Sequence, residues 1–136
     1  MIPLHISDVQ LHCINEAAIE FNVPAKLIIA ILNVERGKSG QAVKNTNGTY
    51  DLGPMQINTI WLPILKKYSI TKHDLQFDPC INVKVGAWLL GRSIASYINF
   101  LKGVGDYHSR TPRFNSEYVQ KVKISYTQIN IELNQN

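Results

Sequence analysis

The sequence predicts a single, mainly α-helical domain with one small irregular or β-hairpin lobe. Its 136 residues fit one domain with a sizeable core, so residues 1–136 are assigned to one unit. Apolar residues recur at helical spacing over most of the chain, and 45% of all residues are hydrophobic. Residues 38–58 are the exception, because Gly, Asn, Thr and Ser dominate there. We therefore expect this segment to form the lobe.

Two helices are predicted before the polar segment. Ser7 and Gln10 have the spacing of a capping box that would start the first helix, which should end near Asn22. Pro24 is compatible with the first turn of the second helix, which should run to Glu35. The apolar face of the second helix comprises Leu27, Ile28, Ile31 and Leu32.

The polar segment and its continuation show turn and cap signals. Asn47-Gly48 is typical of a tight hairpin turn. Asn58 or Thr59 could cap a following helix, and Thr71 with Asp74 has the spacing of another capping box. These signals predict a helix through Trp61, Leu65 and Tyr68, and a further helix that starts at Thr71.

The second half of the chain is predicted to hold two long helices. Asp78-Pro79 is a strong start for an apolar helix at the centre of the core, which Gly103 and Gly105 should break. Residues 106–114 should form a polar, aromatic loop. After Asn115 or Ser116 the spacing predicts a helix, while alternation near the end leaves a strand as the second interpretation. The residues of the helical pattern are Val119, Val122, Tyr126, Ile129 and Leu133, and those of the alternating pattern are Ile129, Ile131 and Leu133.

Charge and hydropathy restrict the classes of partner. The net charge of +4 favours acidic partners, but the basic residues are scattered and lack the aromatic interleaving of a nucleic-acid module. We therefore expect no nucleic-acid partner. The longest apolar stretch, residues 27–32, is too short to span a bilayer. No signal segment opens the given chain, so an exported protein would be present here in its mature form.

The cysteines and histidines do not suggest a metal site or a cofactor. Cys13 and Cys80 show no metal-ligand spacing, and the four histidines stand apart. The cysteines are either two small buried thiols or one long-range disulfide. Such a bridge would stabilise the fold by roughly 4 kcal/mol.

Glu35 is the first candidate for chemistry. A carboxylate at a helix end is ordinarily a solvated surface group. Glu35, however, follows Ile31 by four residues and lies on or beside the apolar face, and Gly37 is a plausible helix stop just after it. Burial and the negative end of the helix dipole would both raise its pKa, as a general acid requires.

Several other residues are candidates that also have ordinary structural interpretations. Asp51 is either a second carboxylate or a turn residue, and Met55 and Gln56 could be core and surface residues of a helix start. Tyr107, His108 and Tyr118 could be a cluster of half-buried aromatic residues. His5, His12 and His73 are expected to be structural or solvated.

Taken together, these residues resemble the soluble lytic transglycosylase family over roughly residues 10–125. The branch that accompanies conjugation, pilus and protein-secretion machines is the most similar. Residues 45–58 also resemble the active-site hairpin of c-type lysozymes, which share the superfamily fold. The motifs of the resemblance are Glu35-Arg36-Gly37, Gly53-Pro54-Met55-Gln56-Ile57-Asn58, Tyr107-His108-Ser109 and Tyr118-Val119.

The resemblance implies a lysozyme-like α+β fold and a role for each motif residue. Glu35 would be the sole catalytic acid and base, and Tyr107 and Tyr118 would flank and orient it. The substrate-binding residues would be Met55, Gln56, Asn58, Tyr107, His108 and Tyr118. Two departures stand out: Arg36 replaces the serine of many members, and His108 replaces an asparagine. Exported relatives often carry a disulfide, which favours the bridge between Cys13 and Cys80.

The resemblance also implies a reaction and a location. The enzyme would cleave the β-1,4 bond between N-acetylmuramic acid and N-acetylglucosamine in peptidoglycan and leave a 1,6-anhydro end. It would act in the periplasm as a monomer, without a cofactor or metal, and open the wall for a secretion, conjugation or pilus apparatus. Two alternatives stay open: a hydrolytic lysozyme that uses Glu35 and Asp51, and a peptidoglycan-binding module without turnover.

Overall fold

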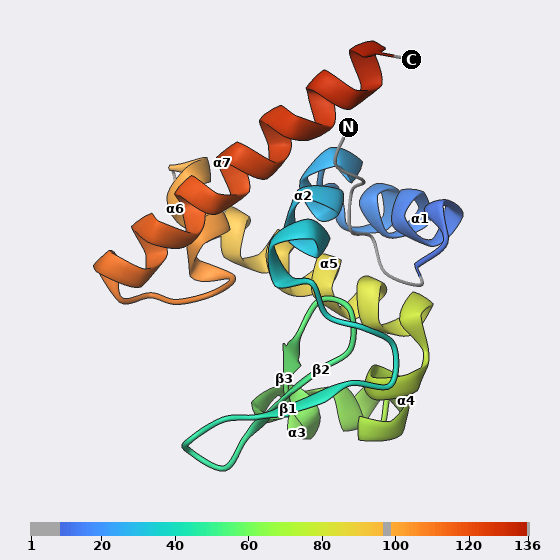
Figure 1. Cartoon of the computed structure of the whole chain (residues 1–136). Helices are drawn as coiled ribbons and strands as arrows, with labels where there is room; N and C mark the ends of the chain where they lie inside the picture. Colours follow the sequence, from blue (N-terminus) through green and yellow to red (C-terminus); the bar gives the residue numbers. More distant parts are fainter. Residues whose placement is uncertain (1–8, 97–98, 136) are drawn as a thin grey trace.

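The computed structural model describes residues 9–96 and 99–135 and confirms the mainly helical fold with a small β lobe (Figure 1). Within these ranges the chain forms seven α-helices, two short 3-10 helices and one three-stranded antiparallel sheet. None of the described helices is long and apolar enough to cross a membrane. The elements in chain order are α1 (Leu11–Phe21), α2 (Ala25–Glu35), β1 (Ala42–Lys44), β2 (Tyr50–Leu52), β3 (Ile57–Asn58), η1 (Thr59–Trp61), α3 (Leu62–Leu65), η2 (Lys66–Tyr68), α4 (Lys72–Phe77), α5 (Pro79–Ala95), α6 (Phe100–Asp106) and α7 (Pro112–Gln135).

Helix α5 connects a helical body to the β lobe. It contacts α1 and α6 in the body and α4 and β3 in the lobe, while α7 packs along α2. Figure 1 shows α1, α2, α6 and α7 in one half of the molecule and the sheet with α3 and α4 in the other. The core lies around α2 and α5, whose fully buried side chains include Ile28, Ile31, Leu32, Val83 and Leu90. Burial of this apolar surface is the main stabilising contribution to the fold.

The starts and ends of the first two helices agree only in part with the predictions. The first helix begins at Leu11, and Gln10 before it has extended backbone, so the predicted capping box is wrong. Ser7 lies outside the described residues. The predicted end near Asn22 is confirmed, because this residue takes a left-handed conformation (φ 53°).

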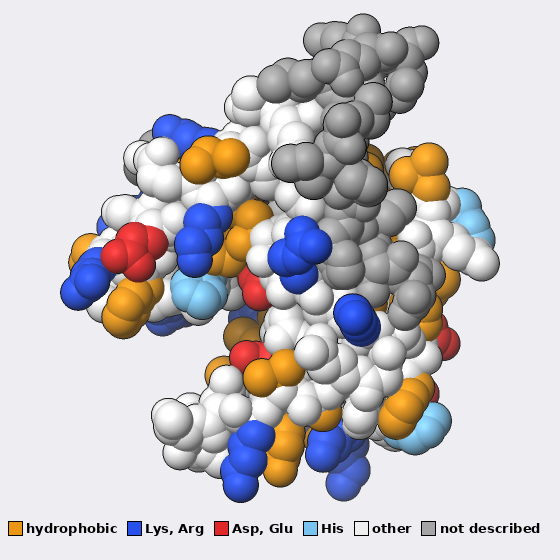
Figure 2. Space-filling view, viewed as in Figure 1, with side chains coloured by type: hydrophobic (Ala, Val, Ile, Leu, Met, Phe, Trp, Pro, Cys, Tyr) orange, Lys and Arg blue, Asp and Glu red, His pale blue; other side chains and the backbone are white. Residues whose placement is uncertain are grey.

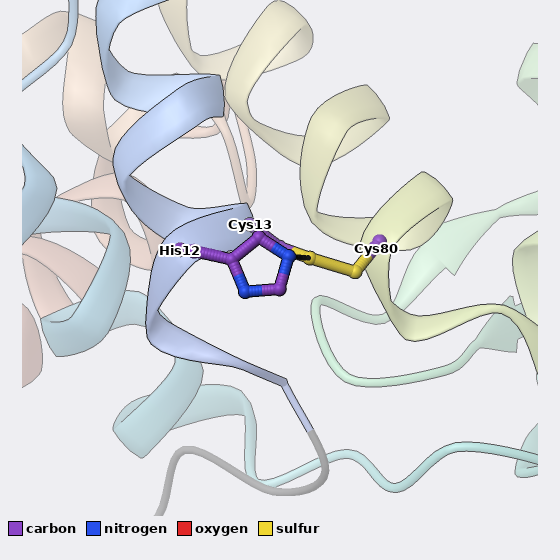
Figure 3. A group of neighbouring side chains, drawn as sticks. All are labelled: His12, Cys13 and Cys80. Carbon is purple, nitrogen blue, oxygen red and sulfur yellow. Dashed lines mark hydrogen bonds between the residues drawn. A yellow bond between two sulfur atoms is a disulfide. The ribbon is translucent and has the colours of Figure 1, made fainter.

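The predicted start of α5 and the disulfide implied by the family resemblance are both confirmed. The side chain of Asp78 accepts hydrogen bonds from the backbone N–H groups of Cys80 and Ile81, and Pro79 occupies the first turn. Cys80 is bonded to Cys13 of α1, with 5.4 Å between their Cα atoms (Figure 3). The ring of His12 lies 3.6 Å from the sulfur of Cys13. Both sulfurs belong to the disulfide, so they are not free to bind a metal ion with His12.

The predicted helix break at Gly103 and Gly105 is wrong. Both glycines lie inside α6, and the long helix α5 has already ended at Ala95. A Cβ on Gly103 would collide with the backbone of α5 at Ile94, and one on Gly105 would collide with the side chain of Asn115. These glycines therefore permit close packing and do not end the helix.

The last helix begins earlier than predicted. It starts at Pro112 instead of after Asn115, so the predicted loop 106–114 is shortened to a turn between α6 and α7. The backbone is helical through Gln135, which makes the strand interpretation of this segment wrong.

The β lobe contains the predicted hairpin. Ala42 of β1 pairs with Leu52 of β2, and Lys44 pairs with Tyr50. The turn between them uses Gly48 at φ +85°, a conformation that glycine adopts without strain. The short strand β3 pairs with β2 on its other edge.

Candidate active site

Glu35 is the last residue of α2, and its carboxyl group lies close enough to Asp51 of the β lobe to be influenced by that charge. Arg36 ends the helix in a left-handed conformation (φ 55°), so the predicted stop at Gly37 is one residue too late. Gly37 is needed for another reason: a Cβ there would collide with the backbone of Gly53 and Pro54. This close approach holds the backbone just after Glu35 against residues 53–54 of the lobe.

The carboxyl group of Glu35 is surrounded by protein on most sides. Burial is the main cause that raises its pKa from the ordinary value of 4.5 to about 7, and the negative charge of Asp51 adds to this rise. The hydrogen bond from Tyr118 and the positive charge of Lys121 act in the opposite direction. The carboxyl group is therefore about half protonated at neutral pH, which suits a group that must both give and take a proton.

Tyr118 and Tyr107 form one wall of the site. The hydroxyl of Tyr118 on α7 donates a hydrogen bond to Oε2 of Glu35 at 2.7 Å. The hydroxyl of Tyr107 donates to the backbone carbonyl of Met55 at 2.9 Å and not to Glu35. The two rings are stacked with centroids 6.4 Å apart. Burial raises the pKa of both phenols well above 10, so both remain protonated hydrogen-bond donors.

His108 lies on the outer side of Tyr118. Its ring is parallel to that of Tyr118 with centroids 4.8 Å apart, and its side chain is exposed. Partial burial, together with the positive charge of Lys121, lowers the pKa of His108. The imidazole is therefore mainly neutral at pH 7 and can both donate and accept a hydrogen bond.

The segment from Gly53 to Asn58 is fixed beneath the groove. The side chain of Met55 is fully buried, and it packs so closely over Gly86 that any Cβ there would collide with it. Gln56 has a left-handed backbone (φ 53°), and its side-chain amide donates to the carbonyl of Gly53 at 2.9 Å. The buried side chain of Met55 is thus withdrawn from ligands, and its backbone N–H and carbonyl are bonded to Asn82 and Tyr107. Gln56, in contrast, is half-buried beside Gly37.

Asp51 and Asn58 face each other across β2 and β3. Nδ2 of Asn58 donates to Oδ1 of Asp51 at 3.0 Å and to the hydroxyl of Thr49 at 3.1 Å. Oδ1 of Asn58 accepts from the N–H of Ile60, which confirms the predicted cap. Asp51 is thus held by the lobe and influences Glu35 through its charge.

Asn82 and Asn115 are functional candidates that sequence reasoning missed. Asn82 is fully buried; it accepts from the N–H of Met55 at 2.8 Å and donates to the carbonyls of Leu52 and Leu75. Asn115 donates to Asp106 and to the carbonyl of Ser109, and thereby fixes the turn that carries Tyr107 and His108. The sequence signal for such a residue is a polar side chain in an otherwise apolar helical face. A buried amide requires hydrogen-bond partners, so this pattern indicates a structural hydrogen bond.

The site lies in a hollow of the surface. Figure 2 shows the molecule notched between the part formed by α6 and α7 and the β lobe, with acidic side chains and a histidine at the notch. A half-buried carboxylic acid at the end of a helix, facing a three-stranded lobe across a groove, defines the lysozyme-like α+β class of proteins.

Comparison with known proteins identifies the family within this class. Residues 12–128 match the transglycosylase SLT domain, so the chain belongs to the transglycosylase SLT family. It is 34% identical over 131 residues to invasion protein IagB of Salmonella typhimurium, covering 93% of this chain and 82% of that protein. It is 32% identical over 129 residues to protein IpgF of Shigella flexneri, covering 91% and 85%. A peptidoglycan-binding-like protein of Escherichia coli O157:H7 is 32% identical over 130 residues, covering 87% and 78%.

Proposed function

We propose that this protein is a lytic transglycosylase that cleaves peptidoglycan glycan strands with Glu35 as its only catalytic acid and base. The observation that supports this most is the pKa of Glu35, raised to about 7 by burial at the lip of the groove. Membership in the transglycosylase SLT family supports the same reaction class. A group with this pKa is protonated often enough to give a proton and is basic enough to take one back.

The proposed reaction has two proton transfers. Glu35 gives its proton to the glycosidic oxygen, the bond from C1 of N-acetylmuramic acid to that oxygen breaks, and N-acetylglucosamine leaves with a free 4-hydroxyl. The N-acetyl group of the muramyl residue stabilises the developing positive charge at C1. The Glu35 carboxylate then removes the proton of the muramyl 6-hydroxyl, whose oxygen attacks C1. The 1,6-anhydro ring forms without water, and Glu35 is protonated again.

The surrounding residues support these steps in distinct ways. The hydrogen bond from the Tyr118 hydroxyl fixes the orientation of the Glu35 carboxyl group and stabilises its charged form. Tyr107 holds the backbone at Met55, which forms the floor of the groove. We assign Gln56 and His108 to substrate contact, because both are accessible and carry hydrogen-bonding groups at the groove. Asn58 holds Asp51 and the hairpin in place.

The hydrolytic alternative depends on Asp51. A lysozyme-type reaction needs a second carboxylate as nucleophile or base. Asp51 accepts a hydrogen bond from Asn58 and contributes negative charge that raises the pKa of Glu35. We therefore propose that Asp51 assists Glu35 electrostatically. The other alternative is a peptidoglycan-binding module without turnover. In that case Glu35, with its raised pKa, would take part in no reaction.

The place of action follows from the substrate. Peptidoglycan is extracytoplasmic, so we propose that the protein acts after export, in the periplasm, as a monomer. The disulfide between Cys13 and Cys80 is typical of that compartment. A relative is named an invasion protein, which supports a role in opening the wall locally for an envelope-spanning apparatus such as a secretion system. The net charge of +4 favours approach to the acidic wall polymer.

Wall clearing by matched variants tests the proposal. Purified wild type, Glu35→Gln and Glu16→Gln are added to suspended sacculi, and turbidity is followed over time. Glu16 is exposed on α1 and serves as a control for the loss of one negative charge. We expect clearing by the wild type and the control and none by Glu35→Gln. Equal clearing by all three proteins, or none by any, would refute the assignment of Glu35.

A further inference from the structure

A second pocket shares a wall with the proposed catalytic groove. It has a volume of about 340 Å³ and is lined by residues of α5, η1, the end of α6 and the turn that follows, including Trp61, Arg92, Asp106, Tyr107 and Arg110. Tyr107 belongs to both sites, since its hydroxyl bonds to Met55 and its ring stacks against Tyr118. The pocket therefore lies next to the proposed groove, with Tyr107 between them.

Arg92 is positioned in the pocket by two aromatic rings. Its guanidinium carbon lies 5.5 Å from the ring centroid of Trp61 and 5.0 Å from that of Trp88. The two indoles meet edge to face with centroids 6.5 Å apart. A guanidinium that stacks through its faces keeps its in-plane N–H groups available for a ligand. Among residues 9–96 and 99–130, whose side chains the structure describes, Arg92 has no acidic partner within ion-pair distance.

The one acidic side chain of the pocket is already neutralised. Asp106 accepts a hydrogen bond from Asn115 at 2.8 Å and lies 4.0 Å from Arg110, and only 6% of its side chain is exposed. Arg110 offsets its charge, which leaves the charge of Arg92 without compensation in the pocket. An anionic group is therefore the complementary ligand.

We propose that this pocket binds a carboxylate of the peptide stem that hangs from the muramyl residues of peptidoglycan, with Arg92 as the specificity-determining residue. The inference rests on the proposed function, because it requires the glycan strand in the neighbouring groove. A carboxylate fits better than a sugar, since Arg92 lies over the ring faces of Trp61 and Trp88 on which a sugar could stack.

Binding of catalytically silent proteins to two substrates tests this proposal. Glu35→Gln and the double variant Glu35→Gln/Arg92→Gln are incubated with intact sacculi and with amidase-treated glycan strands that lack the peptide. We expect the added Arg92→Gln to weaken binding to intact sacculi about tenfold, which corresponds to about 1.4 kcal/mol, and to change binding to stripped strands less than twofold. Arg113→Gln in the same background is the matched control, because Arg113 pairs with Glu117 outside the pocket. Equal loss on both substrates, or no loss on either, would overturn the proposal.

A second measurement needs no substitution at Arg92. The chain has two tryptophans, and both contact Arg92, so their two indole N–H resonances report directly on the pocket. We expect both resonances to shift when the free acidic stem peptide is added to the wild type, and to stay in place when its carboxylates are converted to amides. Absence of a shift, or the same shift with the amidated peptide, would contradict the proposal. Because neither test requires turnover, a protein that binds in this way but does not cleave would refute the proposed reaction and leave the pocket assignment intact.

Discussion

The phenol of Tyr118 donates a 2.7 Å hydrogen bond to Oε2 of Glu35 across 83 positions of sequence. The contact joins α7 to the end of α2, two helices that pack along each other. Burial raises the pKa of Glu35, whereas this hydrogen bond lowers it because it stabilises the charged form of the carboxyl group. Proton affinity and orientation of the proposed catalytic acid are therefore set by the packing of these two helices.

Tyr118→Phe should slow the reaction and move its pH dependence upward. The substitution removes a contact that lowers the pKa of Glu35, so this pKa should rise above its present value of about 7. The alkaline limb of the rate profile, where Glu35 has lost its proton, should move to higher pH. Loss of a hydrogen bond to a charged group also predicts a roughly tenfold or greater decrease in rate. Rates between pH 5 and 9 test this, with Tyr126→Phe on the same helix as control.

Glu35→Gln should increase stability at alkaline pH while it abolishes activity. The pKa of Glu35 is about 7 in the folded protein and near 4.5 in the unfolded chain, so the folded state binds more protons between these values. The free energy of unfolding of the wild type therefore falls as pH rises from about 4.5 to 7. The variant lacks this loss and should be more stable at pH 8 by on the order of 2 kcal/mol.

Urea unfolding of both proteins at pH 4 and pH 8 checks the sign. The advantage of Glu35→Gln should be small at pH 4, where the wild-type carboxyl is neutral in both states. A variant that is less stable than the wild type at pH 8 would show that the carboxylate of Glu35 is favourably solvated or paired.

Asp51→Asn should leave much of the activity in place. Removal of this negative charge takes away one cause of the raised pKa of Glu35, so the alkaline limb of the rate profile should move to lower pH. The hydrogen bond from Asn58 can be retained by the amide oxygen of the new side chain. We expect less than about a tenfold decrease in rate near pH 6, well short of the 10²–10⁴-fold that a general acid or base contributes. A variant as inactive as Glu35→Gln would assign Asp51 to the chemistry.

Asn82→Ala should destabilise the fold and loosen the groove. The substitution removes the partners of the Met55 N–H and of the carbonyls of Leu52 and Leu75, all of which lie in the interior. Unsatisfied buried groups cost about 1–3 kcal/mol each, so a loss of roughly 3 kcal/mol or more is expected. Thermal unfolding measures it, with the exposed Asn15→Ala in α1 as control. A change below about 0.5 kcal/mol would contradict this role.

Replacement of both cysteines by serine should lower stability without changing the chemistry. The bridge closes a long loop, whose ends are 67 positions apart in the sequence, and its loss should cost about 2–5 kcal/mol. The disulfide joins α1 to the first turn of α5, whereas Glu35 ends α2 and its partner Tyr118 lies on α7. The rate well below the melting temperature should therefore equal that of the wild type. A large decrease in rate at such a temperature would link the disulfide to the site.

Local signals in the sequence predicted much of the fold. The caps at Asp78 and Asn58 and the turn at Asn47-Gly48 depend on neighbouring residues, so the sequence reveals them directly. The helix break predicted at Gly103 and Gly105 is wrong because these glycines serve tertiary packing: they allow α6 to approach α5 and Asn115 closely. Helical propensity disfavours glycine inside a helix and does not include contacts between helices.

In the candidate site too, features that depend on neighbouring residues were predicted, and contacts between distant segments were not. The position of Glu35 beside an apolar helix face indicated burial, and its pKa of about 7 agrees with that expectation. The contact from Tyr118, the connection of Tyr107 to Met55, and the support from Asn82 all join segments that are distant in sequence. Only a family resemblance pointed to the two tyrosines. For Asn82 the local signal was its polar side chain in an otherwise apolar helix, and this signal does not say which backbone groups it binds.

Mass spectrometry of the muropeptides released from purified sacculi tests the central claim most directly. If the Glu35 carboxylate takes the proton of the muramyl 6-hydroxyl, the 1,6-anhydro ring forms. Every new muramyl end made by the wild type should then be lighter by one water than a reducing end. Glu35→Gln should release none of these products, and Asp51→Asn should release the same anhydro products as the wild type. Reducing muramyl ends from the wild type, together with an inactive Asp51→Asn, would contradict the account and identify a hydrolase.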